Sequence, residues 1–198
     1  KCLSSIDTRY KKIVIENTRD LNLKKKIERK FNNSKVILNS NKGFGAANNL
    51  GVKIAKTKYV LITSPDVILK KNTIKKLFIT ANKLKNDFAI LSPVSKFVKN
   101  KKPIETKLAY GYSFLVERKK FKSVGGFDSK FFLYYEDEDL SKRMKKKYGK
   151  IYLVPNARVN HLEGGLYKKK FIHEIELCKN WHYMWSKFYF NKKHNGKL

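Results

Sequence analysis

Short β-rich runs alternate with helical patterns along this chain, and that alternation restricts its fold more than any other feature. Runs rich in Val, Ile and Leu occupy 13–15, 36–38 and 59–62, and segments with helical spacing of apolar residues lie between them, at 23–31 and 46–54. A βαβαβ order is typical of parallel strands joined by crossover helices. We therefore expect an α/β fold in which helices flank a mostly parallel sheet.

The rest of the chain continues this pattern. A helix is expected after an N-cap at Asn72 or Thr73, strands at 88–91, 110–117 and 151–154, a Lys-rich loop at 96–107, and helices at 138–148 and 171–190. A length of 198 residues suits one domain, and we see no internal repeat or linker. Residues 1–198 are therefore predicted to form a single domain.

The formal net charge of +30 raises the question of a polyanionic partner. Arg supplies only six of the 46 basic residues, whereas proteins that read bases and phosphates favour the bidentate fork of Arg. We rank a solvated basic face first, an anionic membrane surface second and nucleic acid last.

The two cysteines and the hydropathy of the chain indicate where in the cell the protein is expected. Cys2 and Cys178 match no metal or redox spacing, which favours reduced thiols in the cytoplasm. No apolar run approaches the roughly 20 residues that span a bilayer. The expected location is cytoplasmic, with peripheral contact at the inner face of the cell membrane as an extension.

Polar clusters follow three of the expected strands, at 16–20, 39–49 and 64–66. Ligands of open α/β sheets bind outside the carboxyl ends of the strands, so these clusters are candidate binding segments. Asp66 could ligate a divalent cation that bridges a diphosphate, or it could simply stabilise a turn. Gly43-Phe44-Gly45 precedes a helix without the spacing of a known phosphate loop, and Asn41, Asn48 and Asn49 could contact a ligand or act as caps.

The run Glu136-Asp137-Glu138-Asp139 holds four of the 16 acidic residues. Mutual repulsion would raise the proton affinity of these carboxylates, which suits a general base, although acids in the first turn of a helix are also favoured by its dipole. The aromatic residues that precede the run favour a walled pocket. His161 follows a strand and is either a structural hydrogen-bonding residue or a ligand.

Taken in order, these segments resemble glycosyltransferase family 2, in particular its rhamnosyltransferase-like branch with the GT-A fold. The resemblance covers nearly the whole chain. It rests on residues 13–17, 41–51, 64–67, 125–132 and 136–140, with Arg143 and His161.

The resemblance implies a site in which Asp137 is the catalytic base and Glu16 contacts the nucleotide base. Asp66 would hold ribose or the metal, Mg²⁺ or Mn²⁺, and His161 would contact the metal or a phosphate. The residues implied in binding the nucleoside-diphosphate sugar and the acceptor are Glu16, Asn17, Asn41, Gly43, Phe44, Asn48, Asn49, Gly125, Gly126 and Glu136. The implied reaction is inverting transfer of a hexosyl or deoxyhexosyl group to a hydroxyl of a polysaccharide or lipid-linked glycan, as in cell-envelope synthesis.

The chain departs from the family pattern at two places. Ser64 stands where the family usually has Asn or Asp, and the family's opening strand would precede Lys1. The predicted sheet therefore lacks its first strand, as in a stretch of a longer protein or in a degenerate enzyme, and the non-Met start favours the former.

Two further functions stay open on the sequence. One is a non-enzymatic basic protein that binds nucleic acid or an anionic surface on a transferase scaffold, and the other is an inactive transferase that assists an active one. For the membrane contact we expect Trp181, Trp185 and Tyr189 to lie at the lipid interface, beside lysine side chains.

Overall fold

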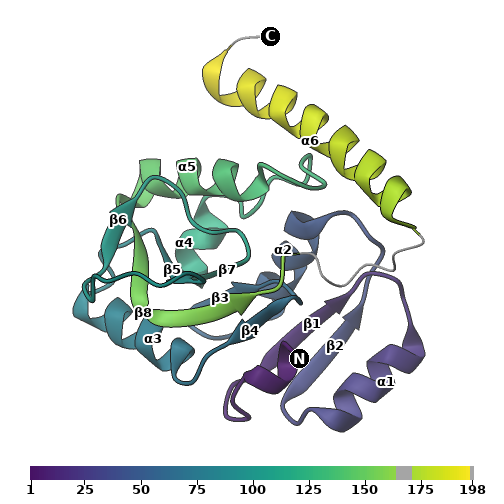
Figure 1. Ribbon diagram of the computed structural model, residues 1–198, viewed down its shortest axis with the longest axis horizontal. Helices are drawn as coiled ribbons and strands as arrows, with labels where there is room; N and C mark the ends of the chain where they lie inside the picture. The colour runs from purple at the N-terminus through teal and green to yellow at the C-terminus, as the bar shows by residue number, and fades with distance from the viewer. Residues whose placement is uncertain (164–170, 197–198) are drawn as a thin grey trace.

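The computed structural model describes residues 1–163 and 171–196, and Figure 1 shows its helices and strands. A short 3-10 helix, η1 (Leu3–Ser5), comes first. The strands are β1 (Lys12–Glu16), β2 (Ser34–Leu38), β3 (Tyr59–Thr63), β4 (Val67–Leu69), β5 (Ile90–Val94), β6 (Ile104–Thr106), β7 (Ser113–Glu117) and β8 (Ile151–His161). The helices are α1 (Leu21–Lys30), α2 (Phe44–Ile54), α3 (Thr73–Lys83), α4 (Arg118–Ser123), α5 (Glu136–Tyr148) and α6 (Ile172–Asn195).

The main sheet is mixed, whereas the sequence pattern predicted a mostly parallel one. Its strand order is β3-β7-β5-β8-β4, with β6 also paired to β8. Among its described strands β5 and β8 are the one hydrogen-bonded parallel pair, because β7 runs antiparallel between β3 and β5. The short strands β4 and β6 also pair with β8 antiparallel.

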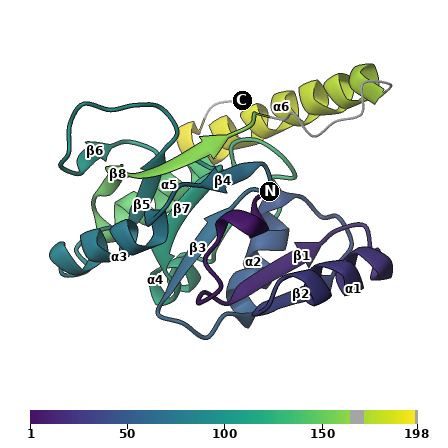
Figure 2. The ribbon, with the colours of Figure 1, turned by 60° about the horizontal axis from the view of Figure 1, so that its bottom comes forward.

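Strands β1 and β2 form a separate parallel pair beside the main sheet (Figure 2). Among the described strands, β1 is hydrogen-bonded only to β2 and β3 only to β7. Each of these two strands therefore has one edge that no described strand pairs with.

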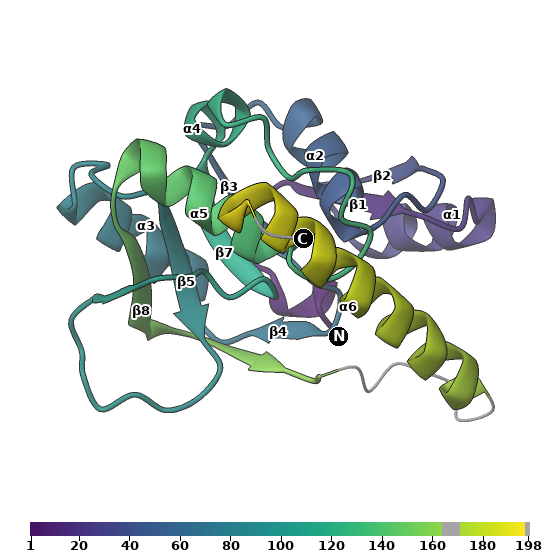
Figure 3. The same cartoon turned by 90° about the horizontal axis from the view of Figure 1, so that it is seen from above.

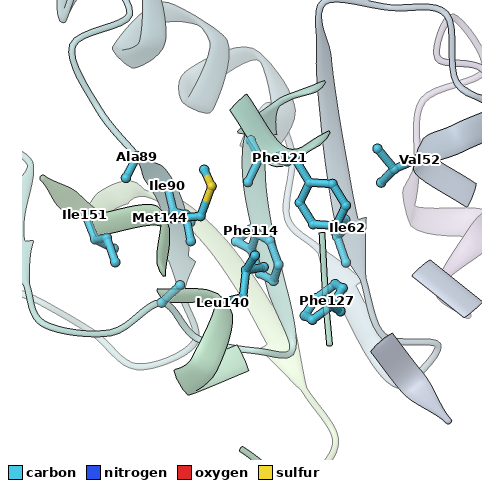
Figure 4. Packing of buried hydrophobic residues seen from close by; sticks show 12 residues of the cluster. Val52, Ile62, Ala89, Ile90, Phe114, Phe121, Phe127, Leu140, Met144 and Ile151 are labelled. Atoms are coloured by element: carbon cyan, nitrogen blue, oxygen red, sulfur yellow. The ribbon is translucent and has the colours of Figure 1, made fainter. Parts of the chain in front are cut away.

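The core has two layers because alternate residues of a strand point to opposite faces of the sheet. In β7, Phe114 and Val116 pack against α2, α4 and α5, whereas Leu115 packs on the other face, against α3. Figure 4 shows the first layer, in which Phe114 and Phe127 lie close to Leu140. Packing on both faces holds the central strands as a rigid base for the loops at their ends.

The late strand β8 is the element that the sequence described least well. We expected it to end at Pro155, but it continues to His161. Its register against β5 shifts between Pro93 and Val94, opposite the segment that holds Pro155, and such an irregularity accommodates a proline that cannot donate a ladder hydrogen bond. The expected loop at 96–107 also contains β6, and the short strand β4 was not predicted.

Helix α6 lies outside the two layers, with its C-terminal half over the start of α5 (Figure 3). Tyr189 faces the domain, where its hydroxyl donates a hydrogen bond to Asp128 at 2.9 Å. The expected position of Tyr189 at a lipid interface is therefore wrong, because the domain already takes up this side of the helix. Among the described residues, no helix is long and apolar enough to cross a bilayer.

Candidate active site

The pairing of β4 with β8 places Asp66 beside His161. Val67 lies opposite His161 in the register, and the amide of Leu162 donates a hydrogen bond to the carbonyl of Asp66 at 3.1 Å. Nε2 of His161 consequently lies 3.2 Å from Oδ2 of Asp66. The two residues predicted as metal ligands, 95 positions apart, thus meet at one end of the main sheet.

A stack of aromatic rings continues from this pair. The ring of Tyr112 lies 4.6 Å from that of His161 and 5.2 Å from that of Tyr110, with small angles between the planes. The amide of Ser64 donates to the carbonyl of Tyr112, so the loop after β3 is tied to the loop before β7. Tyr110, a residue that is 43% exposed, forms the outer end of the stack.

Asp137 lies directly against Gly111, the residue between Tyr110 and Tyr112 in the sequence. A Cβ atom at Gly111 would be 2.3 Å from Oδ2 of Asp137, so only a glycine leaves room for the carboxylate. Burial raises the pKa of Asp137, although hydrogen bonds from the peptide N–H groups of Glu138, Asp137 and Gly111 act in the opposite direction. A carboxylate with a raised pKa suits the removal of a hydroxyl proton near neutral pH.

The turn that leads into α5 is strained. Tyr134 and Tyr135 have φ angles of 70° and 62°, in the left-handed region, where a non-glycine residue costs on the order of 1 kcal/mol. Rings of α6 hold them there, with Tyr183 at 5.8 Å from Tyr134 and Phe190 at 5.1 Å from Tyr135. Helix α6 therefore supports the turn that positions Asp137.

Glu136 is a buried carboxyl beside Asp137. Burial is the main cause that raises its pKa from the usual 4.5 to about 8, and the charge of Asp137 adds to it. Repulsion within the acidic run, which the sequence suggested as the cause, is thus secondary. Oε2 of Glu136 has no hydrogen-bond partner in the described part of the chain, so a neutral, protonated Glu136 is favoured near pH 7.

Replacing Glu136 by Gln should change how stability depends on pH. Between about pH 4.5 and pH 8 the folded wild type keeps a proton that the unfolded chain has lost, so its free energy of unfolding falls as pH rises. The variant lacks this contribution and should gain on the wild type by up to roughly 1 kcal/mol per pH unit across that window.

Urea unfolding of both proteins from pH 5 to pH 8.5 measures this difference. The control is Glu105→Gln, because Glu105 is a half-exposed carboxylate that pairs with Lys145. A Glu136→Gln difference that stays constant with pH would show that Glu136 is ionised throughout.

Asp139, the last acid of the run, has a structural role. Arg143 donates to Oδ2 at 2.6 Å, and Lys193 and His194 of α6 contact Oδ1 at 2.7 and 2.8 Å. Burial acts to raise the pKa of Asp139, but these contacts outweigh it and leave the pKa below its usual value. The carboxylate therefore anchors the C-terminal end of α6 to α5.

The polar clusters after β1 and β2 meet each other. The side-chain amide of Asn39 donates to Oδ1 of Asn17 at 3.0 Å. The Glu16 carboxylate accepts hydrogen bonds from Thr18 and from the amide of Asp20, and the bond from the Thr18 hydroxyl is the main cause of its lowered pKa. These bonds shape the loop after β1, and the contact of Glu16 with a nucleotide base stays a prediction.

The segment before α2 is fixed against the segment before α5. Gly43 has a φ of 94°, and a Cβ atom there would be 2.4 Å from the carbonyl oxygen of Phe132, which also accepts from the amide of Phe44. Asn41 accepts from the amide of Gly43, and Asn48 donates to the carbonyl of Phe44. Neither side chain caps α2, whose N-cap is Gly43. The Asn41 bond lies in the turn before the helix and the Asn48 bond lies within it, and contact of either residue with a ligand stays a prediction.

Asn49 and Gly126 join α2 to the glycine turn. The side chain of Asn49 exchanges two hydrogen bonds with the backbone of Phe127, at 2.8 and 2.9 Å. Gly126 has a φ of 66°, and a Cβ there would be 2.4 Å from Oδ1 of Asn49. The turn also lines a hollow of about 350 Å³, whose walls are Val124, Gly125, Gly126, Phe127, Asp128, Ser129, Arg143 and Lys193.

Among the residues predicted for the site, Asp66, His161 and Asp137 are therefore connected through contacts of Tyr112 and Gly111. The hollow beside Gly125 and Gly126 does not include them. Tyr110, Gly111 and Tyr112 were missed, because a glycine between two tyrosines was interpreted as the start of a strand. The signal that could have revealed them is a glycine that interrupts an otherwise β-rich segment.

Asp66 and His161 could hold a metal ion that is also bound by the diphosphate of a substrate. No group of three or more His, Cys, Asp or Glu that could hold a metal gathers within 1–163 and 171–196. A carboxylate suits Mg²⁺ or Mn²⁺, and Mg²⁺ commonly takes one or two carboxylates from the protein and further ligands from phosphates and water. The pair therefore suits a metal–diphosphate complex better than a metal alone.

Comparison with known families decides the assignment. The family model described as Glycosyl transferase family 2 matches residues 3–140, well over half of the chain. The chain belongs to glycosyl transferase family 2. An N-acetylglucosaminyl-diphospho-decaprenol L-rhamnosyltransferase of Mycobacterium tuberculosis (strain ATCC 25618 / H37Rv) is 45% identical over 51 residues, which are 26% of this chain and 17% of that protein.

Solved structures agree with the fold of this family 2 chain. GalNAc-T7 with UDP, GalNAc and Mn²⁺ has a TM-score of 0.65 at 16% identity, over 76% of this chain and 37% of that one. Residues 1–349 of S. aureus TarS with UDP-GlcNAc have a TM-score of 0.59 at 14% identity, over 91% and 61%. The mannosyltransferase PcManGT of Pyrobaculum calidifontis, with GDP-Man and Mn²⁺, has 0.63 at 14%, over 79% and 48%.

The fold is thus GT-A, as the sequence resemblance implied. The chain spans about a sixth of the length of the curated relative that it matches and between a third and two thirds of these solved chains.

Proposed function

We propose that this family 2 chain transfers a sugar from a nucleoside-diphosphate sugar to a hydroxyl group, with inversion at the anomeric carbon. The observation that carries the proposal is the line of contacts from Asp66 through His161, Tyr112 and Gly111 to Asp137. This line of contacts supports the proposal because it connects two carboxylates, to which we assign the binding of a metal–diphosphate complex and the role of base.

The proposed reaction is a single displacement. The acceptor oxygen forms a bond to the anomeric carbon on one side, while the bond from that carbon to the diphosphate oxygen breaks on the other. Asp137 takes the hydroxyl proton as the new bond forms, and the nucleoside diphosphate leaves with the electron pair. Attack opposite the leaving group inverts the configuration.

The other residues would position the substrates. Asp66 and His161 would hold a divalent cation, Mg²⁺ or Mn²⁺. Its positive charge would stabilise the negative charge of the departing diphosphate. The exposed ring of Tyr110 offers an apolar surface for a sugar ring. Glu136 would be protonated and uncharged, so no second negative charge would lie beside Asp137.

The acceptor that we favour is a polysaccharide or a lipid-linked glycan in cell-envelope synthesis. Support comes from the mycobacterial relative, whose name specifies a decaprenol-linked acceptor and L-rhamnose transfer. We accordingly place the reaction at the cytoplasmic face of a membrane.

A thermal-shift series with nucleoside diphosphates, with and without Mn²⁺, tests the nucleotide site. A diphosphate at about 100 times its dissociation constant stabilises by about 2.7 kcal/mol, which raises Tm by roughly 5–10 °C in a chain of this size. The Mn²⁺-dependent part of this rise should vanish in Asp66→Asn and persist in Asp7→Asn, because Asp7 pairs with Arg9 at the surface.

If no diphosphate raises Tm while single-stranded RNA binds with a steep salt dependence, the alternative of a basic nucleic-acid-binding protein is favoured.

A further inference from the structure

Helix α6 has one face that is occupied by the domain. The hydroxyl of Ser186 donates to the carbonyl of Leu133 at 2.8 Å, Phe190 is buried, and Lys193 pairs with Asp128 and Asp139. These residues recur at intervals of three or four, so they mark one side of the helix. The other side faces away from the domain.

That other side carries large apolar residues in regular helical spacing. Leu177, Trp181, Met184 and Phe188 are separated by four, three and four positions and are 71%, 64%, 60% and 44% exposed. Trp185 lies at the edge of this row, with its ring 6.0 Å from that of Phe188, and is 47% exposed. We call these five residues the outer stripe. The opposite face of α6 holds the helix on the domain, so the outer stripe is left exposed to solvent.

The charge around the outer stripe indicates which kind of surface would cover it. Helix α6 has two acidic residues, Glu174 and Glu176, near its start, and from Cys178 to Asn195 it contains none. That part has four lysines, of which Lys193 pairs with the domain, and the whole chain has a net charge of +30. Two copies of such a chain repel each other, and one face of a single helix is small beside the roughly 800 Å² per partner of a stable protein interface. An anionic surface would instead attract the lysines.

Trp, Met, Phe and Leu together suit the boundary between lipid headgroups and acyl chains. Lysine side chains at the edges of such a row can extend to the phosphates while their methylene groups stay in the apolar layer. Lys187 lies three positions after Met184 and Lys192 four positions after Phe188, so both lysines are next to the row.

We propose that α6 lies in the plane of an anionic lipid bilayer with the outer stripe inserted below the headgroups. Because the opposite face of α6 is bonded to Asp128 and Asp139, the domain is then held with the start of α5, and so Asp137, near the membrane. This last consequence rests on the proposed function, in which a lipid-linked acceptor is presented there. The binding itself requires no sugar transfer.

Vesicle binding tests the proposal through intrinsic fluorescence. The two tryptophans of the chain both belong to the outer stripe, so a blue shift of their emission reports on it directly. We expect this shift and co-sedimentation with vesicles that contain phosphatidylglycerol, and much weaker binding to pure phosphatidylcholine. The double variant Trp181→Ser, Met184→Ser should bind at least roughly tenfold more weakly.

The matched control is Leu21→Ser, Phe97→Ser, which removes two apolar side chains of comparable exposure, 59% and 78%, that lie outside α6. It should bind vesicles within about twofold of the wild type. Equal binding to both kinds of vesicle, or equal losses in the two double variants, would overturn the proposal. So would sedimentation equilibrium that shows a dimer disrupted only by the Trp181, Met184 variant, since a second copy would then cover the stripe. No sugar donor is present, so a failure here leaves the proposed transfer reaction untouched.

Discussion

Replacing Asp137 by Asn should lower the rate of sugar transfer by about three orders of magnitude while nucleotide binding changes little. A general base contributes on the order of 10²–10⁴ to a rate, and Asn has nearly the same shape as Asp but cannot accept the hydroxyl proton. The nucleotide would be bound by other residues, so kcat should fall with a small change in KM for the donor. Initial rates at saturating donor, together with calorimetric binding of the nucleoside diphosphate, measure both quantities.

Glu138→Gln is the matched control for this substitution. It removes one negative charge from the same first turn of α5 and leaves Asp137 in place. Its turnover should stay within a few-fold of the wild type. If Asp137→Asn retained a comparable rate, Asp137 would not be the base, and equal losses in both variants would indicate that the charge of the turn, and no single carboxylate, matters.

The elements with the clearest local signals were predicted from the sequence. Strands β1 and β3 each contain a continuous run of apolar residues, and the apolar residues of α1, α2 and α3 recur at helical spacing. In each case the residues that define the element lie within about ten positions of one another, so periodicity alone suffices.

Elements that depend on distant partners were not predictable in this way. The strand β8 continues past Pro155 because β5 and β4 pair with its later residues, from Arg158 to His161, and this pairing outweighs the local preference of proline. The same reason explains β6, which exists only through its pairing with β8.

The candidate site follows the same division. The acidic run was recognised from four consecutive residues. The different roles of Asp137 as proposed base, Glu136 as buried acid and Asp139 as anchor of α6 depend on contacts with residues that are distant in the sequence. Asp139 is bound by His194, 55 positions away, and Asp137 lies against Gly111, 26 positions before it. Sequence alone could therefore indicate where the chemistry lies but could not separate the roles of neighbouring carboxylates.

Gly111 is the residue through which this separation can be tested, because its lack of a side chain leaves the space that the Asp137 carboxylate occupies. In Gly111→Ala the new Cβ would lie 2.3 Å from Oδ2 and 2.8 Å from Cγ of Asp137, so the carboxylate must move. A displacement of about 1 Å costs roughly 100-fold in rate when the displaced group acts on the reacting atoms. Overpacking should also lower the free energy of unfolding by about 1–3 kcal/mol. Transfer rates and urea unfolding of the same preparation measure both effects.

Gly51→Ala separates displacement of Asp137 from the general effect of adding a methyl group. At Gly51 in α2 the nearest atom to a new Cβ would be Cγ1 of Ile15 at 3.7 Å, an ordinary contact, and alanine favours a helix over glycine by about 1 kcal/mol. This variant should be as stable as the wild type or more so, with an unchanged rate.

Addition of Gly111→Ala to the Asp137→Asn background provides the final comparison. If Gly111 acts only by positioning the Asp137 carboxylate, the second substitution should lower the residual rate much less than it does in the wild type, whereas a full further 100-fold loss would mean that Gly111 contacts the substrates independently of Asp137.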